Sequence, residues 1–272
     1  GGMAAILASL KEFRRTKGLK ILFYCDEEYD FKGMKKFIAE YKFRSRLAVS
    51  AEPTELKIWN GARGIIKISF RVKGLTAPAS RPDLGKNAIL GLVGAANHLA
   101  ESLKIYKTKN LGISTCNLAA ISGGLNLGQV ISQKGDAVPD IAEGLLDIRS
   151  GQVLLSAKII KKILKGFLAK NGFKLLDFKV YHELKAFYTS PEKIKPAERV
   201  IKNTIGRVSY LNLRQMGYQD IQLLQEKLKT PAFSFGPRGG NRHQPNEWVN
   251  IADLDRVKKT YQALISTWCL AR

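Results

Sequence analysis

The chain has 272 residues, with 45 lysines and arginines against 23 aspartates and glutamates, and a formal charge of +22. Hydrophobic residues make up 45% and charged residues 25%, a globular composition that excludes a disordered chain. The apolar runs are short and interrupted by lysine, glycine or aspartate, so no segment is expected to span a bilayer.

The three cysteines, Cys25, Cys116 and Cys269, are far apart and form no C-x-x-C motif. This pattern excludes a disulfide framework and a cysteine zinc site, and it favours a reducing compartment. A cytoplasmic location is therefore predicted. Because the sequence opens on Gly1-Gly2-Met3, we expect either added glycines or a piece of a longer protein.

The first sixty residues alternate between helix and strand patterns. Apolar spacing predicts a helix over Met3–Arg15, and the nearly continuous apolar run Leu19–Cys25 predicts a strand buried on both faces. A helix is predicted over Phe31–Tyr41 and a second strand over Arg46–Ser50. This alternation predicts a mostly parallel sheet covered by helices.

The middle of the chain has the pattern of a sheet with one face in water. Residues 65–72 alternate apolar and polar side chains, and a loop rich in Pro, Gly and Ala follows at Gly74–Asn87. The order strand, helix, strand, strand, helix, strand predicts a ferredoxin-like unit with both helices on one face. The elements are expected at residues 65–72, 89–103, 111–121, 141–149, 158–168 and 174–181.

Helix and strand patterns alternate again after Pro191. Helices are predicted at residues 196–205, 218–228 and 253–270, and a short strand at 232–235. We therefore interpret the ferredoxin-like segment as an insertion in a larger α/β domain. Residues 1–63 and 182–272 would form the larger domain, and residues 64–181 the inserted one.

The excess of positive charge is spread along the whole chain. Lys158, Lys161, Lys162 and Lys165 recur on one helical face opposite apolar residues, which predicts the solvent-exposed side of a packed helix. No basic run is interleaved with aromatic residues, so specific nucleic-acid binding is not expected. Non-specific binding of polyanions at low salt is expected, because it needs only charge density.

Acidic or imidazole side chains follow three of the predicted strands, at Asp26-Glu27-Glu28, at Glu52 and at His243. Ligands of open parallel sheets bind at the carboxyl ends of the strands, so these residues are expected at one edge. Carboxylates and imidazoles bind divalent metals, and a free glutamate beside a metal can move a proton. The pattern therefore suggests metal-assisted hydrolysis, with ordinary polar loop residues as the alternative.

Five short motifs occur in order along the chain. They are Cys25-Asp26-Glu27-Glu28, Ala51-Glu52-Pro53-Thr54, Gly85-Lys86-Asn87-Ala88, Val138-Pro139-Asp140 with Asp147-Ile148-Arg149, and Gly236-Pro237 followed by His243 and Pro245-Asn246-Glu247. Together they resemble a known family, the two-zinc amidohydrolases that include succinyl-diaminopimelate desuccinylase, acetylornithine deacetylase, aminoacylase and glutamate carboxypeptidase. In that family a zinc-peptidase-like α/β domain is interrupted by a ferredoxin-like lid that mediates dimerisation, which is the organisation predicted above.

The resemblance implies hydrolysis of a linear amide bond in an N-acyl amino acid or small peptide. It implies two Zn²⁺ ions per subunit, with Co²⁺ or Mn²⁺ as alternatives, and a homodimer formed through the lid. Glu27 would be the general base. The implied metal ligands are Glu28, Glu52 and His243, and the implied substrate-binding residues are Arg149 and Asn87.

The chain also departs from the family pattern. The family's first metal-binding histidine and its bridging aspartate lie upstream of Gly1, so we expect this chain alone to bind at most one zinc weakly and to have little amidase activity. Pro78, Asp136, Gln222 and Arg238 replace a histidine, an asparagine, an arginine and a glycine of the family. Two other interpretations therefore stay open: a catalytically impaired relative that dimerises as a binding protein, and a polyanion-binding protein.

Overall fold

The computed structural model describes residues 1–27, 30–42, 44–127, 130–132 and 135–269. By its internal contacts the chain divides into two compact units. Unit 1 comprises Gly1–Ala62 and Phe187–Arg272, and unit 2 comprises Arg63–Ala186. Two distant segments of the sequence therefore build unit 1, and the segment between them builds unit 2.

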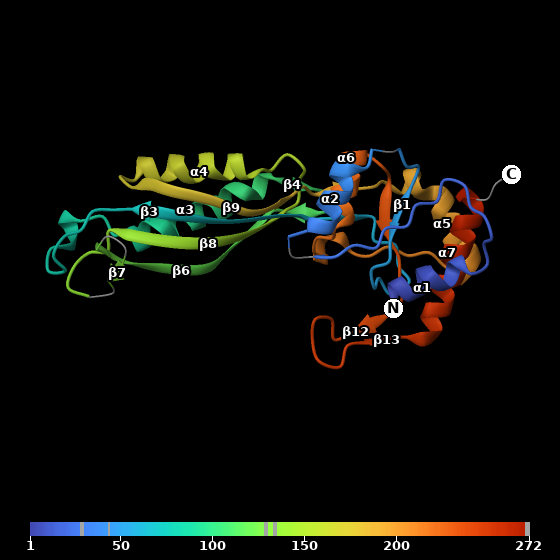
Figure 1. Ribbon diagram of the computed structural model, residues 1–272. Coiled ribbons are helices and arrows are strands. Elements are labelled where there is room, and N and C mark those ends of the chain that lie inside the picture. Colours follow the sequence, from blue (N-terminus) through green and yellow to red (C-terminus); the bar gives the residue numbers. More distant parts are fainter. Residues whose placement is uncertain (28–29, 43, 128–129, 133–134, 270–272) are drawn as a thin grey trace. The chain divides into compact units, whose positions relative to one another are not determined.

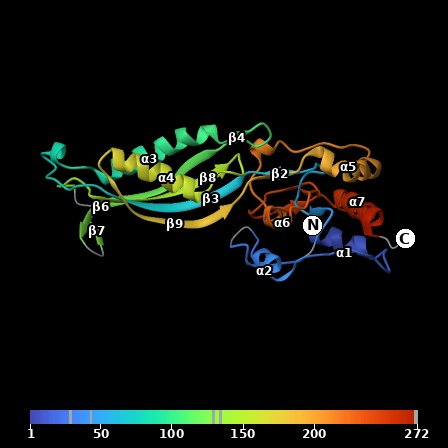
Figure 2. The ribbon, with the colours of Figure 1, turned by 90° about the horizontal axis from the view of Figure 1, so that it is seen from above.

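Unit 2 is a five-stranded antiparallel sheet with two helices on one face (Figures 1 and 2). Its strand order is β7-β6-β8-β3-β9, the ferredoxin-like order with one extra edge strand. The elements of unit 2 are β3 (Gly64–Lys73), η1 (Pro82–Leu84), α3 (Ala88–Ser102), η2 (Leu103–Ile105), β4 (Lys107–Thr108), β5 (Gly112–Ile113), β6 (Thr115–Leu127), β7 (Val130–Ser132), β8 (Ile141–Ser150), α4 (Ala157–Lys170) and β9 (Lys174–Leu184).

The helices of unit 2 bury their apolar faces on the sheet. Leu92 of α3 and Leu164 of α4 are completely buried in one core with Ile66 and Ile148 of the strands. The four lysines expected on the outer face of α4 are exposed, which confirms the predicted amphipathic helix. The hydroxyl of Ser156 accepts a hydrogen bond from the N–H of Ile159 and so caps the start of α4.

Unit 1 packs its helices around a short parallel strand pair. β1 pairs with β11 in register, Ala48 opposite Ala232 and Ser50 opposite Ser234. Phe233, Phe235 and Val257 lie at the centre of the core. The elements of unit 1 are α1 (Gly2–Leu10), α2 (Lys32–Glu40), β1 (Ala48–Ser50), β2 (Gly61–Ala62), β10 (Phe187–Tyr188), α5 (Pro191–Ile205), η3 (Leu213–Gln215), α6 (Ile221–Leu228), β11 (Ala232–Ser234), β12 (Gly239–Gly240), β13 (Trp248–Val249) and α7 (Ile251–Cys269).

The predicted strand over Leu19–Cys25 is wrong: none of these residues is part of a strand. A strand exists only where a neighbour pairs with its backbone, and an apolar run alone cannot supply that neighbour. Leu22 and Tyr24 are half-buried, whereas Ile21, Phe23 and Cys25 are exposed. Only one face of the segment is therefore partly buried, and Cys25 lies on the exposed face.

Two helix boundaries differ from the prediction by five residues each. The first helix ends at Leu10, five residues before the predicted end at Arg15, and Lys11 and Glu12 after it are exposed. Helix α5 begins at Pro191, five residues earlier than predicted, with Pro196 inside it. Across the described part of the chain, no helix combines the length and the apolar character needed to cross a membrane.

Candidate functional site

The loop after β1 and the loop after β11 are joined by hydrogen bonds. The buried hydroxyl of Thr54 accepts a hydrogen bond from the N–H of Gly236 at 2.9 Å. The N–H of Leu56 donates to the carbonyl of Gly236 at 2.8 Å, and the N–H of Glu55 donates to the carbonyl of Pro237 at 3.3 Å. The segment that carries Glu52 is therefore fixed against the segment that leads to His243.

Gly236 is required at this contact because the two backbones come very close. A Cβ atom built on Gly236 would lie 2.1 Å from the carbonyl oxygen of Glu52, a distance no side chain can occupy. The amide of Phe235 also donates to the carbonyl of Ser50 at 2.9 Å. The parallel strands thus end at the same level, as the carboxyl ends of neighbouring parallel strands do.

Glu27 and Glu52 lie in the same region of unit 1, around Tyr24. Burial, together with the negative charges of Asp220, Glu27 and Glu52, raises the pKa of the Tyr24 hydroxyl well above its usual range. Of these three carboxylates, Asp220, which is buried, has the largest effect on the pKa of Tyr24. Tyr24 is therefore a neutral hydroxyl among carboxylates.

Glu52 is half-buried, and its charge reaches a second tyrosine. Burial and then the charge of Glu52 raise the pKa of Tyr261, which is almost fully buried. The Tyr261 hydroxyl donates to the carbonyl of Phe235 at 2.5 Å. Glu52 thus lies near the end of β11 as well as near Tyr24.

Gln222 stands where the family named in the sequence analysis has an arginine. It is buried, and its side chain hydrogen-bonds the turn before α6. Its side-chain oxygen accepts a hydrogen bond from the N–H of Gln219 at 2.7 Å. The Gln219 side chain in turn bonds the hydroxyl of Ser234 in β11. Gln222 is therefore part of a buried hydrogen-bond network, in which an unpaired polar group would be costly.

His243 lies in the exposed connection between β12 and β13, and its φ of 58° is in the left-handed region. Its neighbour Arg242 donates a hydrogen bond from the guanidinium to the carbonyl of Pro53, the residue after Glu52. The hairpin that carries His243 is thus in contact with the Glu52 loop. Sequence analysis placed both residues at strand ends but could not show this contact.

The described residues do not complete a metal site. Within the described ranges, no three His, Cys, Asp or Glu side chains lie close enough together to hold a metal ion. The predicted ligand Glu28 lies outside the described residues. Of the predicted ligands, Glu52 and His243 lie within the described ranges and supply suitable donor groups, but they do not form a full ligand set.

The two predicted substrate-binding residues belong to unit 2, where each makes a contact within the unit. Arg149, at the end of β8, forms a two-pronged ion pair with Asp147, with N–O distances of 2.8 and 3.1 Å. The side-chain oxygen of Asn87 accepts hydrogen bonds from the N–H groups of Ile89 and Leu90 and so caps α3. Their binding of substrate stays a prediction.

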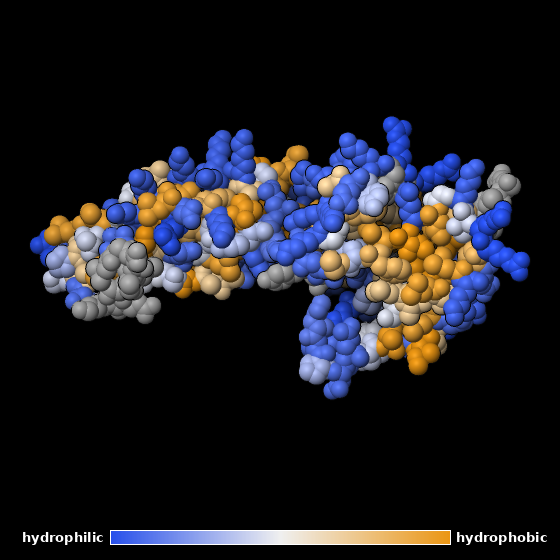
Figure 3. Space-filling view, viewed as in Figure 1, coloured by the Kyte–Doolittle hydropathy of each residue, from blue (hydrophilic) through white to orange (hydrophobic). Residues whose placement is uncertain are grey.

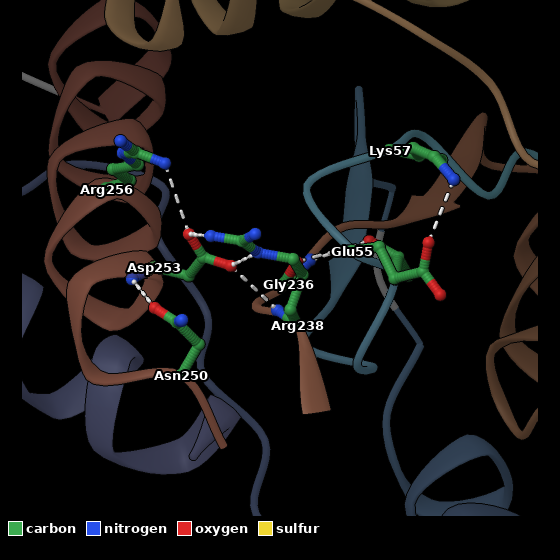
Figure 4. Close-up of polar contacts among 8 residues, drawn as sticks. Glu55, Lys57, Gly236, Arg238, Asn250, Asp253 and Arg256 are labelled. Atoms are coloured by element: carbon green, nitrogen blue, oxygen red, sulfur yellow. Dashed lines mark hydrogen bonds and ion pairs between the residues drawn. The ribbon is translucent and has the colours of Figure 1, made fainter. Parts of the chain in front are cut away.

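Sequence analysis missed the best-defined charged cluster of unit 1, shown in Figure 4. The carboxylate of Asp253, completely buried at the start of α7, binds Arg238 through Nε at 2.5 Å and Nη2 at 3.0 Å. Arg256 contacts the same carboxylate at 3.3 Å, and hydrogen bonding to Arg238 lowers the pKa of Asp253. The Asn250-x-x-Asp253 spacing at the start of α7 was a visible capping signal, because Asn250 accepts from the N–H of Asp253.

Comparison with known proteins now identifies the family. The family model described as "Peptidase family M20/M25/M40" matches residues 1–267, and the chain belongs to this family. The chain is 23% identical over 279 residues to acetylornithine deacetylase from Buchnera aphidicola, covering 97% of this chain and 68% of that enzyme. It is 22% identical over 286 residues to succinyl-diaminopimelate desuccinylase from Nitrosospira multiformis, covering 100% of this chain and 73% of that enzyme.

Solved structures show the same fold. Aminopeptidase PepT from Bacillus cereus superposes with a TM-score of 0.74 at 19% identity, covering 97% of this chain and 69% of that chain. The Bacillus subtilis YXEP protein, described as a dinuclear metal binding peptidase, gives 0.67 at 17% identity, covering 98% and 70%. The chain thus spans about two thirds of the length of these relatives.

The contact at Gly236 gives a testable prediction. Gly236→Ala should destabilise unit 1 by about 1–3 kcal/mol, because the new methyl group forces the Glu52 loop away. Gly217→Ala is the matched control: its Cβ would meet nothing within 4 Å, so a change within about 0.5 kcal/mol is expected. Urea unfolding measures both, and equal stabilities of the two variants would contradict the contact.

Proposed function

We propose that the protein hydrolyses a linear amide bond in an N-acyl amino acid or small peptide. The observation that supports the proposal is that the charges of Glu27 and Glu52 both act on Tyr24, while Arg242, next to His243, hydrogen-bonds the loop that carries Glu52. Membership of the peptidase family supports a hydrolase of this kind. The names of its relatives, a deacetylase and a desuccinylase of amino acids, support the acyl amino acid class.

In this proposal Glu27 is the general base. Its carboxylate is exposed, so it can accept a proton from the attacking water and deliver it to the leaving amine. Tyr24 stays protonated because burial and three carboxylates raise its pKa. It would therefore serve as a neutral hydrogen-bond donor near the reaction and would not compete with Glu27 for the proton.

A divalent metal is part of the proposal, with zinc as the expected ion. When bound, such an ion polarises the amide carbonyl and lowers the pKa of water. Glu28, Glu52 and His243 would be its ligands. Arg149 would bind the substrate carboxylate, and Asn87 would be a second substrate-binding residue.

The base assignment is tested by Glu27→Gln, assayed on N-acetyl and N-succinyl amino acids. Turnover should fall by about 10²–10⁴-fold, because the amide cannot accept a proton. Metal content, measured by elemental analysis, should stay unchanged, because Glu27 is not a ligand. Glu40→Gln, an exposed glutamate on α2, is the control and should keep full activity. Full activity in Glu27→Gln would refute the assignment.

We also propose that the protein is a homodimer formed through unit 2. The edge strand β9 exposes Leu176, Val180 and Tyr181, whereas the lysines of α4 would repel their symmetry mates. Sedimentation in moderate salt should show a dimer at micromolar concentration, and Val180→Lys should shift it toward monomer. Leu154→Lys, at an exposed residue of unit 2 outside the sheet, should leave the dimer intact. A monomeric wild-type protein would contradict the proposal.

A further inference from the structure

The hairpin that carries His243 has little of its own to hold it in place. Its two strands, β12 and β13, contain two residues each, and such a short ladder is marginal in water. All residues from Asn241 to Trp248 are exposed, so no apolar side chain of the turn is buried. The surface over this loop is correspondingly hydrophilic in Figure 3. Its position therefore depends on the hydrogen bond from Arg242 to the carbonyl of Pro53 and on the polar contacts at its base.

Those contacts converge on Arg238, the residue immediately before β12. Its guanidinium binds both oxygens of Asp253, and its own N–H donates to the same carboxylate at 3.2 Å. Its carbonyl accepts a hydrogen bond from the N–H of Asn250, the residue after β13, at 2.9 Å. Arg238 thus connects both ends of the hairpin to the start of α7.

The ion pair joins the completely buried carboxylate of Asp253 to the half-exposed guanidinium of Arg238. A buried carboxylate without its cation is costly, whereas a bidentate pair with arginine fixes direction as well as distance. Arg256 contacts Asp253 from within α7 itself, so it neutralises charge without touching the hairpin. Both arginines therefore bind the Asp253 carboxylate, but only Arg238 links the hairpin to it.

We propose that Arg238 is a positioning residue for His243: its ion pair with Asp253 fixes the β12–β13 hairpin and thereby the imidazole that it presents. The residue acts through the hairpin and does not touch substrate or metal. This inference rests on the proposed function in one respect, the assignment of His243 as a metal ligand. Arg238 thus sets the orientation of the β12–β13 hairpin relative to the start of α7.

The experiment compares Arg238→Gln with Arg256→Gln, which removes a cation from the same carboxylate. The rate of trypsin cleavage after Arg242, followed by mass spectrometry, measures how mobile the hairpin is. Titration with Zn²⁺ alone measures the metal affinity to which the His243 imidazole would contribute. Arg238→Gln should be cleaved several-fold faster and bind Zn²⁺ about 10-fold more weakly, as loss of a residue supporting a ligand does. Arg256→Gln should match the wild type in both measurements.

Two further variants distinguish a failure of the anchoring role of Arg238 from a failure of the ligand assignment of His243. Arg238→Lys keeps the charge but not the two-pronged geometry, so it should be intermediate and remain folded if Arg238→Gln does not. Equal behaviour of Arg238→Gln and Arg256→Gln in both measurements would overturn the inference. Unchanged Zn²⁺ affinity in His243→Ala would overturn the ligand assignment instead, and faster cleavage of Arg238→Gln would still support the anchoring of the hairpin.

Discussion

The close approach of Gly236 to the carbonyl of Glu52 is the constraint on which unit 1 depends. It follows from the parallel register of β1 and β11, which sets Ser50 opposite Ser234 and makes both strands end at one level. The hydroxyl of Thr54 then pairs with Gly236, so the two loops cannot separate. Every predicted site residue of unit 1 in the described range lies in or beside these loops or the segment at Tyr24.

The geometry of the chain at its unit boundaries explains how so long an insertion is accommodated. Unit 2 begins and ends on neighbouring antiparallel strands, with Ile65 of β3 opposite Leu184 of β9. Just outside it, Gly61 and Ala62 of β2 pair with Tyr188 and Phe187 of β10. The chain therefore leaves unit 1 and returns to it at neighbouring positions. Because the two ends of the insertion are already paired, a long insertion adds little loop-closure entropy cost to the folding of unit 1.

Sequence patterns predicted the amphipathic helices correctly and failed where strand formation depends on a pairing neighbour. The lysine stripe of α4 opposite Leu164 gave that helix correctly, because helical periodicity is local. Leu19–Cys25 has the composition of a strand, yet no composition can supply a pairing neighbour. In the site, the motifs singled out Glu52 and His243, but the ion pair of Arg238 with Asp253 joins residues whose partnership no spacing reveals.

The central claim is that Glu27, Glu52 and His243 serve one site beside the β1–β11 strand ends. Paramagnetic broadening by Mn²⁺, followed by NMR in the labelled protein, tests it most directly. The account predicts that substoichiometric Mn²⁺ broadens the His243 ring together with the amides of Thr54 and Gly236. Broadening of exposed acidic positions such as Asp255 and Glu101, with the His243 ring and Gly236 unaffected, would contradict it.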